Sequence, residues 1–266
     1  MTADAQGPAP SAGSQTVQRA FEILRLVAYG QEGGVRLTDI VQSSGLNRPT
    51  VHRLLRTLIQ ENAVEQDPLT RRYRIGSELI LLGIARTRCF PLLSMSSTHL
   101  LQLAQQVGDT VFLSIRHGND SICIGRQTGH HPIQVLSIEV GTRRPLGVSV
   151  SGVALLATLP REESARITMA NERRLALHQL KCEDVLDRID MARKVGYAYA
   201  PIGIMPGTRA VAIPVCSDTG RPLAALTITA MSERLGSARL PQVLEQMQAQ
   251  ALQIAHHYDA VQTGGS

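Results

Sequence analysis

The strongest constraint on the fold is an amphipathic segment at residues 48–60, RPTVHRLLRTLIQ. Its large apolar residues recur at helical spacing and, at about 100° per residue, fall within an arc of roughly 140°. They are Val51, Leu54, Leu55, Leu58 and Ile59. Arg53 and Arg56 lie nearly opposite that arc, and Pro49 suits a first helical turn, where no amide donor is needed. The segment therefore predicts a helix, capped by Asn47, with one buried face and one basic face.

Two helices are predicted before this segment and a pair of short strands after it. Residues 16–29 carry apolar side chains at helical spacing, and residues 37–44 indicate a short helix with Thr38 as its N-cap. Residues 62–76 are expected to form two short strands joined by a turn, and the arm after the turn carries Arg71, Arg72 and Arg74. The face of the first helix that we expect to be buried consists of Val17, Ala20, Phe21, Leu24, Val27 and Ala28. This order of elements predicts a winged helix-turn-helix.

A winged helix-turn-helix gives the basic face a physical role. The major groove of duplex DNA is wide enough for one helix, and phosphates flank it on both sides. Residues 14–88 carry eleven Arg and seven acidic residues, so they hold most of the formal net charge of +5. A modest excess of this kind also occurs on ordinary solvated surfaces. It is the joint pattern of capped turn, basic helix face and basic hairpin that favours DNA binding.

The remainder of the chain mixes strands and helices in an order that predicts an α+β domain. Residues 77–88 are expected to form a connecting helix capped by Ser77, and Phe90-Pro91 marks a boundary. Strands are expected at 110–116, 121–127, 132–139, 209–216 and 223–230. Helices are expected near 92–107, 151–158, 161–180, 183–195 and 240–260.

Composition argues against several other classes of protein. Trp is absent and aromatic residues make up 3%, which disfavours the binding of single strands by base stacking. The cysteines are scattered without a C-x-x-C pair, so buried free thiols are expected instead of a zinc site or a disulfide framework. No apolar run is long enough to cross a membrane, and residues 1–13 indicate a flexible, disordered tail instead of a signal peptide. We therefore predict a cytoplasmic protein with no cofactor, no metal site and no catalytic residues.

Several segments resemble, in order and spacing, the IclR family of bacterial transcription regulators. TVQRAFEIL and LTDIVQSSGLNRPTVHRLLRTLIQENAVEQDPLTRRYRIG resemble its DNA-binding domain. VGDTVFLSI, GTRRPLGVSVSGVALLATLP, RKVGYAYAPIGIMPGTRAVAIPV and GRPLAALTIT resemble its effector-binding domain. The resemblance implies a winged helix-turn-helix joined by a linker helix to a GAF-like α+β effector-binding domain. The implied boundaries are a tail at 1–13, a winged domain at 14–76, a linker helix at 77–89 and an effector domain at 90–262.

The resemblance also implies a DNA-binding surface. By position in the family motif it consists of Arg19, Arg48, Thr50, His52, Arg53, Arg56, Arg72 and Arg74. The angular positions on the helix independently support Arg53 and Arg56 best. His52 borders the buried arc, so packing is its alternative role.

An effector pocket is implied in the same way. Its residues are Val150, Ser151, Ala200, Ala210, Thr227 and Thr229. Family members that bind small oxo-acids carry acidic residues where this chain has Ala-Pro-Ile-Gly after the Gly-Tyr, and Ala210 stands where the family can supply a thiol. We therefore expect a larger or more apolar organic acid, for example an aromatic one. Amides at a helix N-terminus near Ser151 would hold its carboxylate, and Arg143 or Arg144 would add charge if either turns inward. The alternative is a vestigial pocket in which the two threonines are ordinary strand residues.

The expected function is a ligand-responsive, sequence-specific transcription regulator, acting as repressor or activator without catalysis. The resemblance implies a homodimer or a dimer of dimers on a palindromic double-stranded DNA operator. One alternative is a ligand-processing enzyme with an appended DNA-binding domain, for which residues 90–266 show no poised nucleophile–base pair. Another is a nonspecific architectural DNA protein, which predicts little sequence preference.

Overall fold

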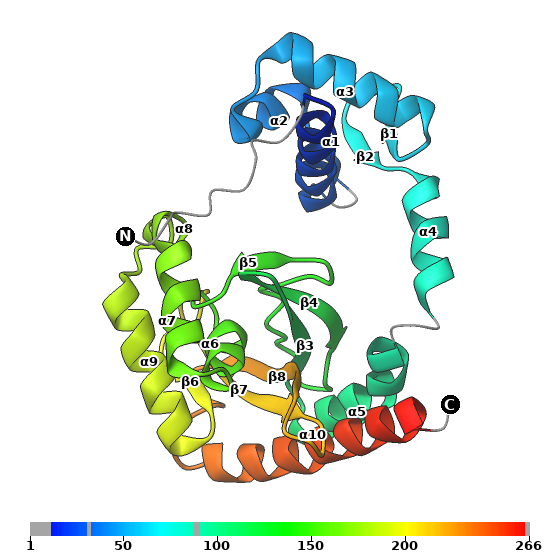
Figure 1. The fold of residues 1–266 in the computed structure, drawn as a ribbon. Helices are drawn as coiled ribbons and strands as arrows, with labels where there is room; N and C mark the ends of the chain where they lie inside the picture. The colour runs from blue at the N-terminus through cyan, green and yellow to red at the C-terminus, as the bar shows by residue number, and fades with distance from the viewer. Residues whose placement is uncertain (1–11, 31–32, 88–90, 264–266) are drawn as a thin grey trace. The chain divides into compact units, whose positions relative to one another are not determined.

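The computed structural model describes residues 12–30, 33–87 and 91–263 (Figure 1). The chain divides into two compact units, Met1–Cys89 and Phe90–Ser266. None of the helices within the described ranges has the length and apolarity needed to cross a lipid bilayer.

The first unit is built from helices and one hairpin. The helices α1 (Ala12–Tyr29), α2 (Leu37–Ser44) and α3 (Arg48–Gln60) come first, the antiparallel strands β1 (Val64–Gln66) and β2 (Tyr73–Ile75) follow, and α4 (Ser77–Thr87) comes last. The predicted winged helix-turn-helix is thus present. α1 begins two residues inside the predicted tail, and residues 1–11 of that tail lie outside the described ranges.

The core of the first unit takes one face from each of its first three helices. Its buried residues are Ile23, Val27, Ile40, Val51, Leu54, Leu55, Val64 and Tyr73. The buried face predicted for α1 is wrong in part, because Val17, Phe21 and Ala28 are exposed while Ile23 is buried. The apolar arc of α1 is broad, and contact with α2, α3 and β2 decides which edge of it is covered.

Two of the predicted helix caps are wrong. α2 begins one residue before Thr38, so Arg36 occupies its cap position and makes no side-chain cap. The Thr38 hydroxyl donates instead to the carboxylate of Asp39. Ser77 is the first residue of α4 instead of its cap. A cap residue has extended backbone just outside the helix, and the path of the incoming chain decides which residue that is.

The second unit is built around one antiparallel sheet of six strands in the order β5-β4-β3-β8-β7-β6. The strands are β3 (Thr110–His117), β4 (Asp120–Gln127), β5 (Arg143–Pro145), β6 (Ala198–Ala200), β7 (Thr208–Cys216) and β8 (Pro222–Met231). The helices are α5 (Pro91–Val107), α6 (Val150–Ala157), α7 (Arg161–Ala170), α8 (Glu172–Ala176), α9 (Cys182–Val195) and α10 (Leu240–Thr263). The α+β class is confirmed.

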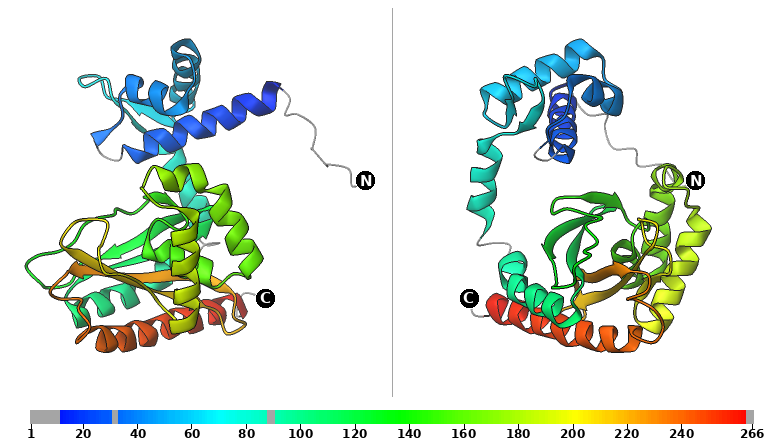
Figure 2. Two further views of the ribbon diagram at one scale, coloured as in Figure 1. Left: turned by 90° about the vertical axis from the view of Figure 1, so that its left-hand side faces the viewer. Right: turned by 180° about the vertical axis from the view of Figure 1, so that it is seen from behind.

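Helices cover both faces of this sheet (Figure 1, Figure 2). α5 and α10 pack together on one face, and α6 with α9 packs on the other. Side chains of β8 alternate between the faces: Leu226 and Ile228 join the core of α5 and α10, whereas Ala225 joins the core of α6 and α9. The same alternation points Thr227 and Thr229 towards α6, where a pocket opens.

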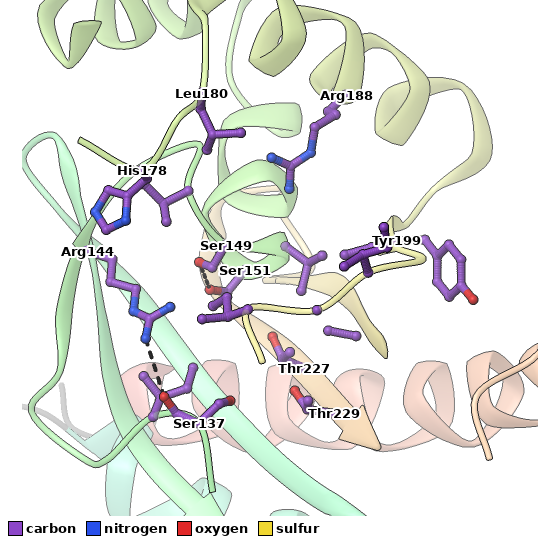
Figure 3. Close-up of a pocket in the computed structure, with 18 of the residues that line it drawn as sticks. Ser137, Arg144, Ser149, Ser151, His178, Leu180, Arg188, Tyr199, Thr227 and Thr229 are labelled. Carbon is purple, nitrogen blue, oxygen red and sulfur yellow. Dashed lines mark hydrogen bonds between the residues drawn. The ribbon is translucent and has the colours of Figure 1, made fainter. Parts of the chain in front are cut away.

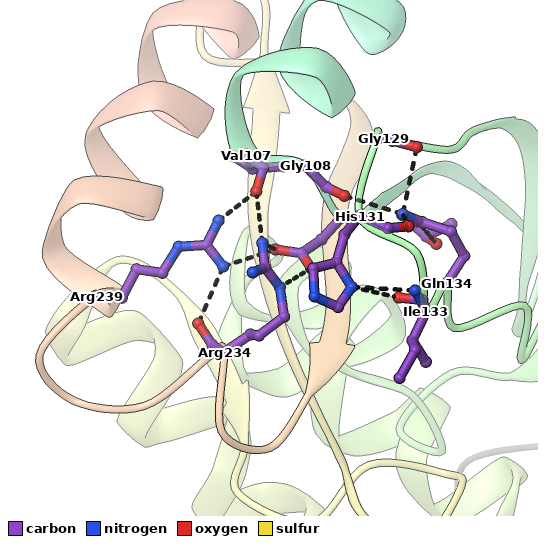
Figure 4. A network of polar contacts seen from close by, with 10 residues as sticks. Val107, Gly108, Gly129, His131, Ile133, Gln134, Arg234 and Arg239 are labelled. Carbon is purple, nitrogen blue, oxygen red and sulfur yellow. Dashed lines mark hydrogen bonds and ion pairs between the residues drawn. The ribbon is translucent and has the colours of Figure 1, made fainter.

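The strand predicted at 132–139 is wrong, because this segment is a loop. The side-chain amide of Gln134 donates hydrogen bonds to the carbonyl oxygens of Gly108, Gly129 and His131 (Figure 4). These bonds hold the segment against the end of α5. The alternating apolar residues predict a strand, but the hydrogen bonds of Gln134 to the backbone of Gly108 and Gly129 hold this segment as a loop.

The helical structure predicted near 161–180 is present as two helices, α7 and α8, which meet at Asn171, and it ends at Ala176. The side-chain amide of Asn171 donates to the carbonyl oxygens of Asn119 and Leu146. This contact with a distant part of the chain accompanies the break. The short strands β5 and β6 have no counterpart in the sequence prediction, since three residues carry too little periodic signal.

A buried carboxylate joins the start of β3 to the segment after β8. Asp109 is 2% exposed, and Arg234 Nε and Arg239 Nη1 each lie 2.7 Å from its oxygens. Both arginines also donate to the carbonyl oxygen of Val107 at the end of α5 (Figure 4). The two guanidinium groups therefore link the end of α5, the start of β3 and the segment after β8.

Candidate functional site

α3 has one buried face and one basic face. Asn47 caps the helix, and its side-chain oxygen accepts a hydrogen bond from the Thr50 amide at 2.9 Å. Thr50 itself is partly buried, and His52, whose alternative role was packing, is exposed. The buried residues are Val51, Leu54 and Leu55. The exposed basic residues are Arg48, His52, Arg53 and Arg56. Burial of the leucine side thus directs the arginine side to solvent.

An open groove of 640 Å³ lies between α2, α3 and the hairpin wing. Arg36 lines it from the cap of α2, Arg48 from the start of α3, and Arg71 from the wing, together with His52. Guanidinium groups around one hollow suit phosphate oxygens, which accept several hydrogen bonds at once. Sequence reasoning found Arg48 and His52 but missed Arg36 and Arg71 as site residues. The run of arginines at 71–74 was the one available signal for Arg71.

The tip of the wing is a tight turn held by Asp67. Its carboxylate accepts hydrogen bonds from the amides of Leu69 and Thr70, at 3.0 and 2.8 Å. Hydrogen bonds from Thr70 lower the pKa of Asp67 below its usual value. Arg74 Nη2 lies 3.5 Å from the same carboxylate. The turn is therefore ordered by its own side chains.

The arginines predicted for the DNA-binding surface differ in their exposure and in their hydrogen bonds. Arg72 donates to the carbonyl oxygens of Gly33 and Gly34, at 3.3 and 3.0 Å, and is partly buried. It therefore anchors the wing to the loop before α2. Arg74 is exposed, and Arg19 is exposed on α1, outside the residues that line the groove. Of the predicted surface residues, the groove brings together Arg48 and His52, whereas Thr50, Arg53, Arg56, Arg72, Arg74 and Arg19 do not line it.

A pocket of 630 Å³ opens in the second unit beside the N-terminus of α6 (Figure 3). All six residues predicted for an effector pocket line it: Val150, Ser151, Ala200, Ala210, Thr227 and Thr229. They come from α6, β6, β7 and β8. Further apolar lining comes from Ile138, Val148, Leu180, Ile202 and Ile204. The pocket is thus mainly apolar, with polar groups at α6 and β8.

The N-terminus of α6 and one buried hydroxyl provide uncharged polar groups. The Ser149 hydroxyl caps α6 by accepting from the Gly152 amide at 3.3 Å, and it lies 2.8 Å from the Ser151 hydroxyl. A helix N-terminus carries partial positive charge and favours anions. The Thr227 hydroxyl is buried and has no hydrogen-bond partner among the residues that the structure describes. A buried hydroxyl in this state is available to a ligand.

Arginine side chains bring full charge to this pocket. Of the two candidates on β5, Arg144 lines the pocket, whereas Arg143 forms an ion pair with Asp120 at 3.1 Å. Arg188, on α9, also lines the pocket and was missed by sequence reasoning. Burial lowers the pKa of both Arg144 and Arg188 below its usual value. Arg144 was one of the two candidates from the sequence, whereas no periodic or motif signal marks Arg188.

The cysteines and the other residue types that bind metals are not clustered into a metal site within the described ranges. There, no three His, Cys, Asp or Glu side chains gather closely enough to hold a metal ion. Cys123, Cys182 and Cys216 are free thiols, and Cys89 lies outside the described residues. Burial raises the pKa of Cys123 to about 11.

Family models match both units of the chain. The model of the IclR helix-turn-helix domain matches residues 16–68, and that of the bacterial transcriptional regulator IclR C-terminal domain matches residues 86–256. The chain belongs to the IclR family of bacterial transcriptional regulators. As an IclR-family protein it is a DNA-binding regulator of transcription, with its helix-turn-helix in the first unit and its effector-binding domain in the second.

Relatives of the IclR family align along most of the chain. The glycerol operon regulatory protein of Streptomyces coelicolor is 32% identical over 229 residues, which cover 83% of this chain and 86% of the relative. A putative IclR regulator from Silicibacter sp. TM1040 superposes with a TM-score of 0.76 at 23% identity, covering 91% and 95% of the two chains. An IclR homologue from Microbacterium hydrocarbonoxydans, crystallised with 4-hydroxybenzoate, gives 0.70 at 20% identity, covering 92% and 99%. These two structures share the fold.

Proposed function

We propose that the basic face of α3 enters the major groove of an operator, and that an organic acid in the pocket of the second unit controls this binding. The observation that carries the proposal is the exposure of Arg53 and Arg56 on a capped helix whose opposite face is buried. Guanidinium groups on an exposed helix face are suited to guanine edges in the major groove. The wing and the arginine-lined groove beside α3 then contact the flanking phosphates.

The DNA part of the proposal is tested by selecting binding sites from a random duplex library with the full chain. The expected result is an enriched sequence that the protein holds against an excess of unrelated duplex at fixed salt. If no sequence is enriched, or if unrelated duplex competes equally, an architectural role replaces operator recognition.

The effector part of the proposal assigns a larger or aromatic organic acid. The α6 N-terminus and the unpartnered Thr227 hydroxyl suit a carboxylate. Ala200 and Ala210 contribute small apolar walls, and a volume of 630 Å³ exceeds what an acid of two or three carbons fills. The bound 4-hydroxybenzoate of the Microbacterium homologue supports an aromatic acid by analogy.

Thermal melting of the full chain with a panel of organic acids tests this assignment. Benzoate-sized acids should raise the melting temperature and change the affinity for the selected duplex, because a ligand that prefers one conformation shifts the population. Stabilisation by glyoxylate and pyruvate alone would refute the size argument. If no acid stabilises the protein, the pocket is vestigial.

We also propose that the regulator acts as a homodimer or a dimer of dimers. Ile80, Leu81, Leu82 and Ile84 on α4 are each between 58% and 62% exposed. A contiguous set of large exposed aliphatic side chains marks an interaction surface, and a second copy of α4 is the proposed occupant. Sedimentation of the wild-type chain and of Ile80→Glu/Ile84→Glu tests this proposal. A wild-type monomer, or a double variant that assembles unchanged, would contradict it.

The alternative of a ligand-processing enzyme finds little chemistry in the pocket. Within the described residues, the Ser149 and Ser151 hydroxyls hydrogen-bond to each other and to a backbone amide, with no histidine or carboxylate partner. Catalysis by a serine nucleophile needs such a base. We therefore propose a regulator without turnover. Incubating the purified protein with a bound acid and analysing the products checks this directly.

A further inference from the structure

The pocket of the second unit holds two guanidinium groups and, among its described lining residues, no carboxylate. Arg144 Nη2 donates to the carbonyl oxygen of Ser137 at 3.3 Å, and Arg188 Nη1 donates to that of Gly147 at 3.1 Å. Asp184, one turn before Arg188 on α9, is exposed and acts on it only through space. Each guanidinium carries five N–H donors, so most of its donors remain available to a ligand.

Arg144 and Arg188 lack a close carboxylate partner among the described residues, as do Arg126 and Arg209, which lie outside the pocket lining. Most other partly buried arginines in the described part of this unit form ion pairs, for example Arg143 with Asp120, Arg193 with Asp190 and Arg234 with Asp109. A partly desolvated charge without a counter-charge is unfavourable. Arg144 and Arg188 therefore favour the binding of anionic groups in the pocket.

The two guanidinium groups belong to different parts of the pocket wall. Arg144 reaches in from β5 and Arg188 from α9, and Figure 3 shows Ser149 and Ser151 between them in that view. Each arginine is held by a different backbone carbonyl, so each has its own place in the wall. A ligand with one carboxylate would neutralise one of them and leave the other uncompensated.

We propose that the effector is a dicarboxylic acid with an apolar, ring-sized body, and that its two carboxylates pair with Arg144 and Arg188. This inference rests on the proposed function, in which an organic acid occupies the same pocket. The apolar body lies against the aliphatic lining, and the Thr227 hydroxyl donates to one of the carboxylates. Bidentate pairing of carboxylate with guanidinium gives the selectivity for the second acid group.

Isothermal titration of the full chain with matched ligands tests the proposal. The probes are benzoate, the three benzenedicarboxylates and their monomethyl esters, which differ in charge at nearly constant shape. The best diacid should bind about tenfold or more tightly than its own monoester, because each charge-assisted contact contributes that much. Arg144→Gln and Arg188→Gln should each reduce this ratio to near one. Arg173→Gln, on an exposed face of α8, should leave it unchanged.

A melt of the unliganded variants separates ligand recognition from folding. Because each glutamine removes a partly buried charge that has no carboxylate within ion-pair distance among the described residues, neither pocket variant should melt below the wild type. A monoester that binds as tightly as its diacid would overturn the inference, and so would variants that keep the preference. Tightest binding of phenyl phosphate, with both charges at one end, would also overturn it.

The outcomes distinguish this inference from the proposed function. If monoacids bind and diacids do not, an organic-acid effector stands and the dicarboxylate fails. If no acid of any kind binds, both fail together. Recognition of the selected duplex by α3 is measured separately and is unaffected by either result.

Discussion

The side-chain oxygen of Asn47 accepts a hydrogen bond from the amide of Thr50 at 2.9 Å, and this contact defines where α3 begins. It satisfies one of the amides that the first turn of any helix leaves unpaired. The same turn carries Arg48 into the groove beside the wing. The cap thus couples the stability of the helix to the position of its basic residues.

Replacing the cap should weaken both folding and DNA binding. Asn47→Ala should lower the free energy of unfolding by about 1 kcal/mol, whereas Asn47→Ser should retain most of it. Affinity for the selected duplex should fall in the alanine variant because the first turn frays. Urea unfolding followed by circular dichroism, together with fluorescence anisotropy, measures both effects. An alanine variant as stable as the wild type would contradict the capping role.

Base contacts and phosphate contacts should respond differently to mutation. Arg53→Ala should weaken binding by about 1–3 kcal/mol and relax sequence preference, because the side chain faces base edges. Arg71→Ala should weaken binding equally on all sequences and reduce the slope of log affinity against log salt by about 1. Arg173→Ala is the control. Unchanged affinity in both test variants would show that another surface faces DNA.

Arg72 should behave differently from its neighbour Arg71. Its guanidinium anchors the wing to the carbonyl oxygens of Gly33 and Gly34. Arg72→Ala should therefore lower the free energy of unfolding by about 1 kcal/mol as well as weaken DNA binding. Arg71→Ala, with an exposed side chain, should change binding alone. Thermal melts and anisotropy titrations of the two variants make the comparison, and equal melting temperatures would exclude the anchoring role.

The buried carboxylate of Asp109 should contribute strongly to stability. Asp109→Ala leaves two partly buried guanidinium groups without their carboxylate partner and should cost about 3 kcal/mol or more. Asp190→Ala removes an exposed carboxylate that also pairs with two arginines, and should cost far less than Asp109→Ala because water screens an exposed pair. Urea unfolding of both variants provides the comparison. Similar losses in the two would show that burial does not decide the contribution.

The buried thiol of Cys123 should make stability fall in alkali. Its pKa in the folded chain is about 11, above the ordinary value of 9.0. The unfolded chain therefore loses this proton first, and the stabilisation present below about pH 9 is lost as pH rises towards 11. Between these limits the wild type should lose about 2 kcal/mol more than Cys123→Ala. Unfolding titrations at several pH values measure this difference, and parallel losses would argue against it.

Much of the first unit could be predicted because its signals are local. Apolar residues at 51, 54 and 55 recur within one helix, and Asn47 lies three residues from the amide that it caps. The first residue of a helix and the exact limits of its buried face were harder to predict. Thr38 was predicted as a cap and Phe21 as buried, and both predictions failed because the neighbouring elements decide which residue starts a helix and which edge of an apolar arc is covered.

In the second unit, regular alternation located β7 and β8, and resemblance to the family supplied the lining residues on them. Neither of these signals could place Arg188 in the pocket, because the path of α9 brings this side chain there. Nor could they choose between Arg143 and Arg144. That choice depends on Asp120, which lies on a neighbouring strand and pairs with Arg143.

The amino-acid sequence by itself determined the winged helix-turn-helix, the α+β class and the family, because these depend on periodicity, turn residues and motif spacing along the chain. Tertiary structure alone decided that Arg36 and Arg71 share a groove with Arg48, and that Arg144 and Arg188 face one pocket. Charges meet or remain unpaired according to distances through space, and residues far apart in the chain become neighbours only when their apolar faces pack.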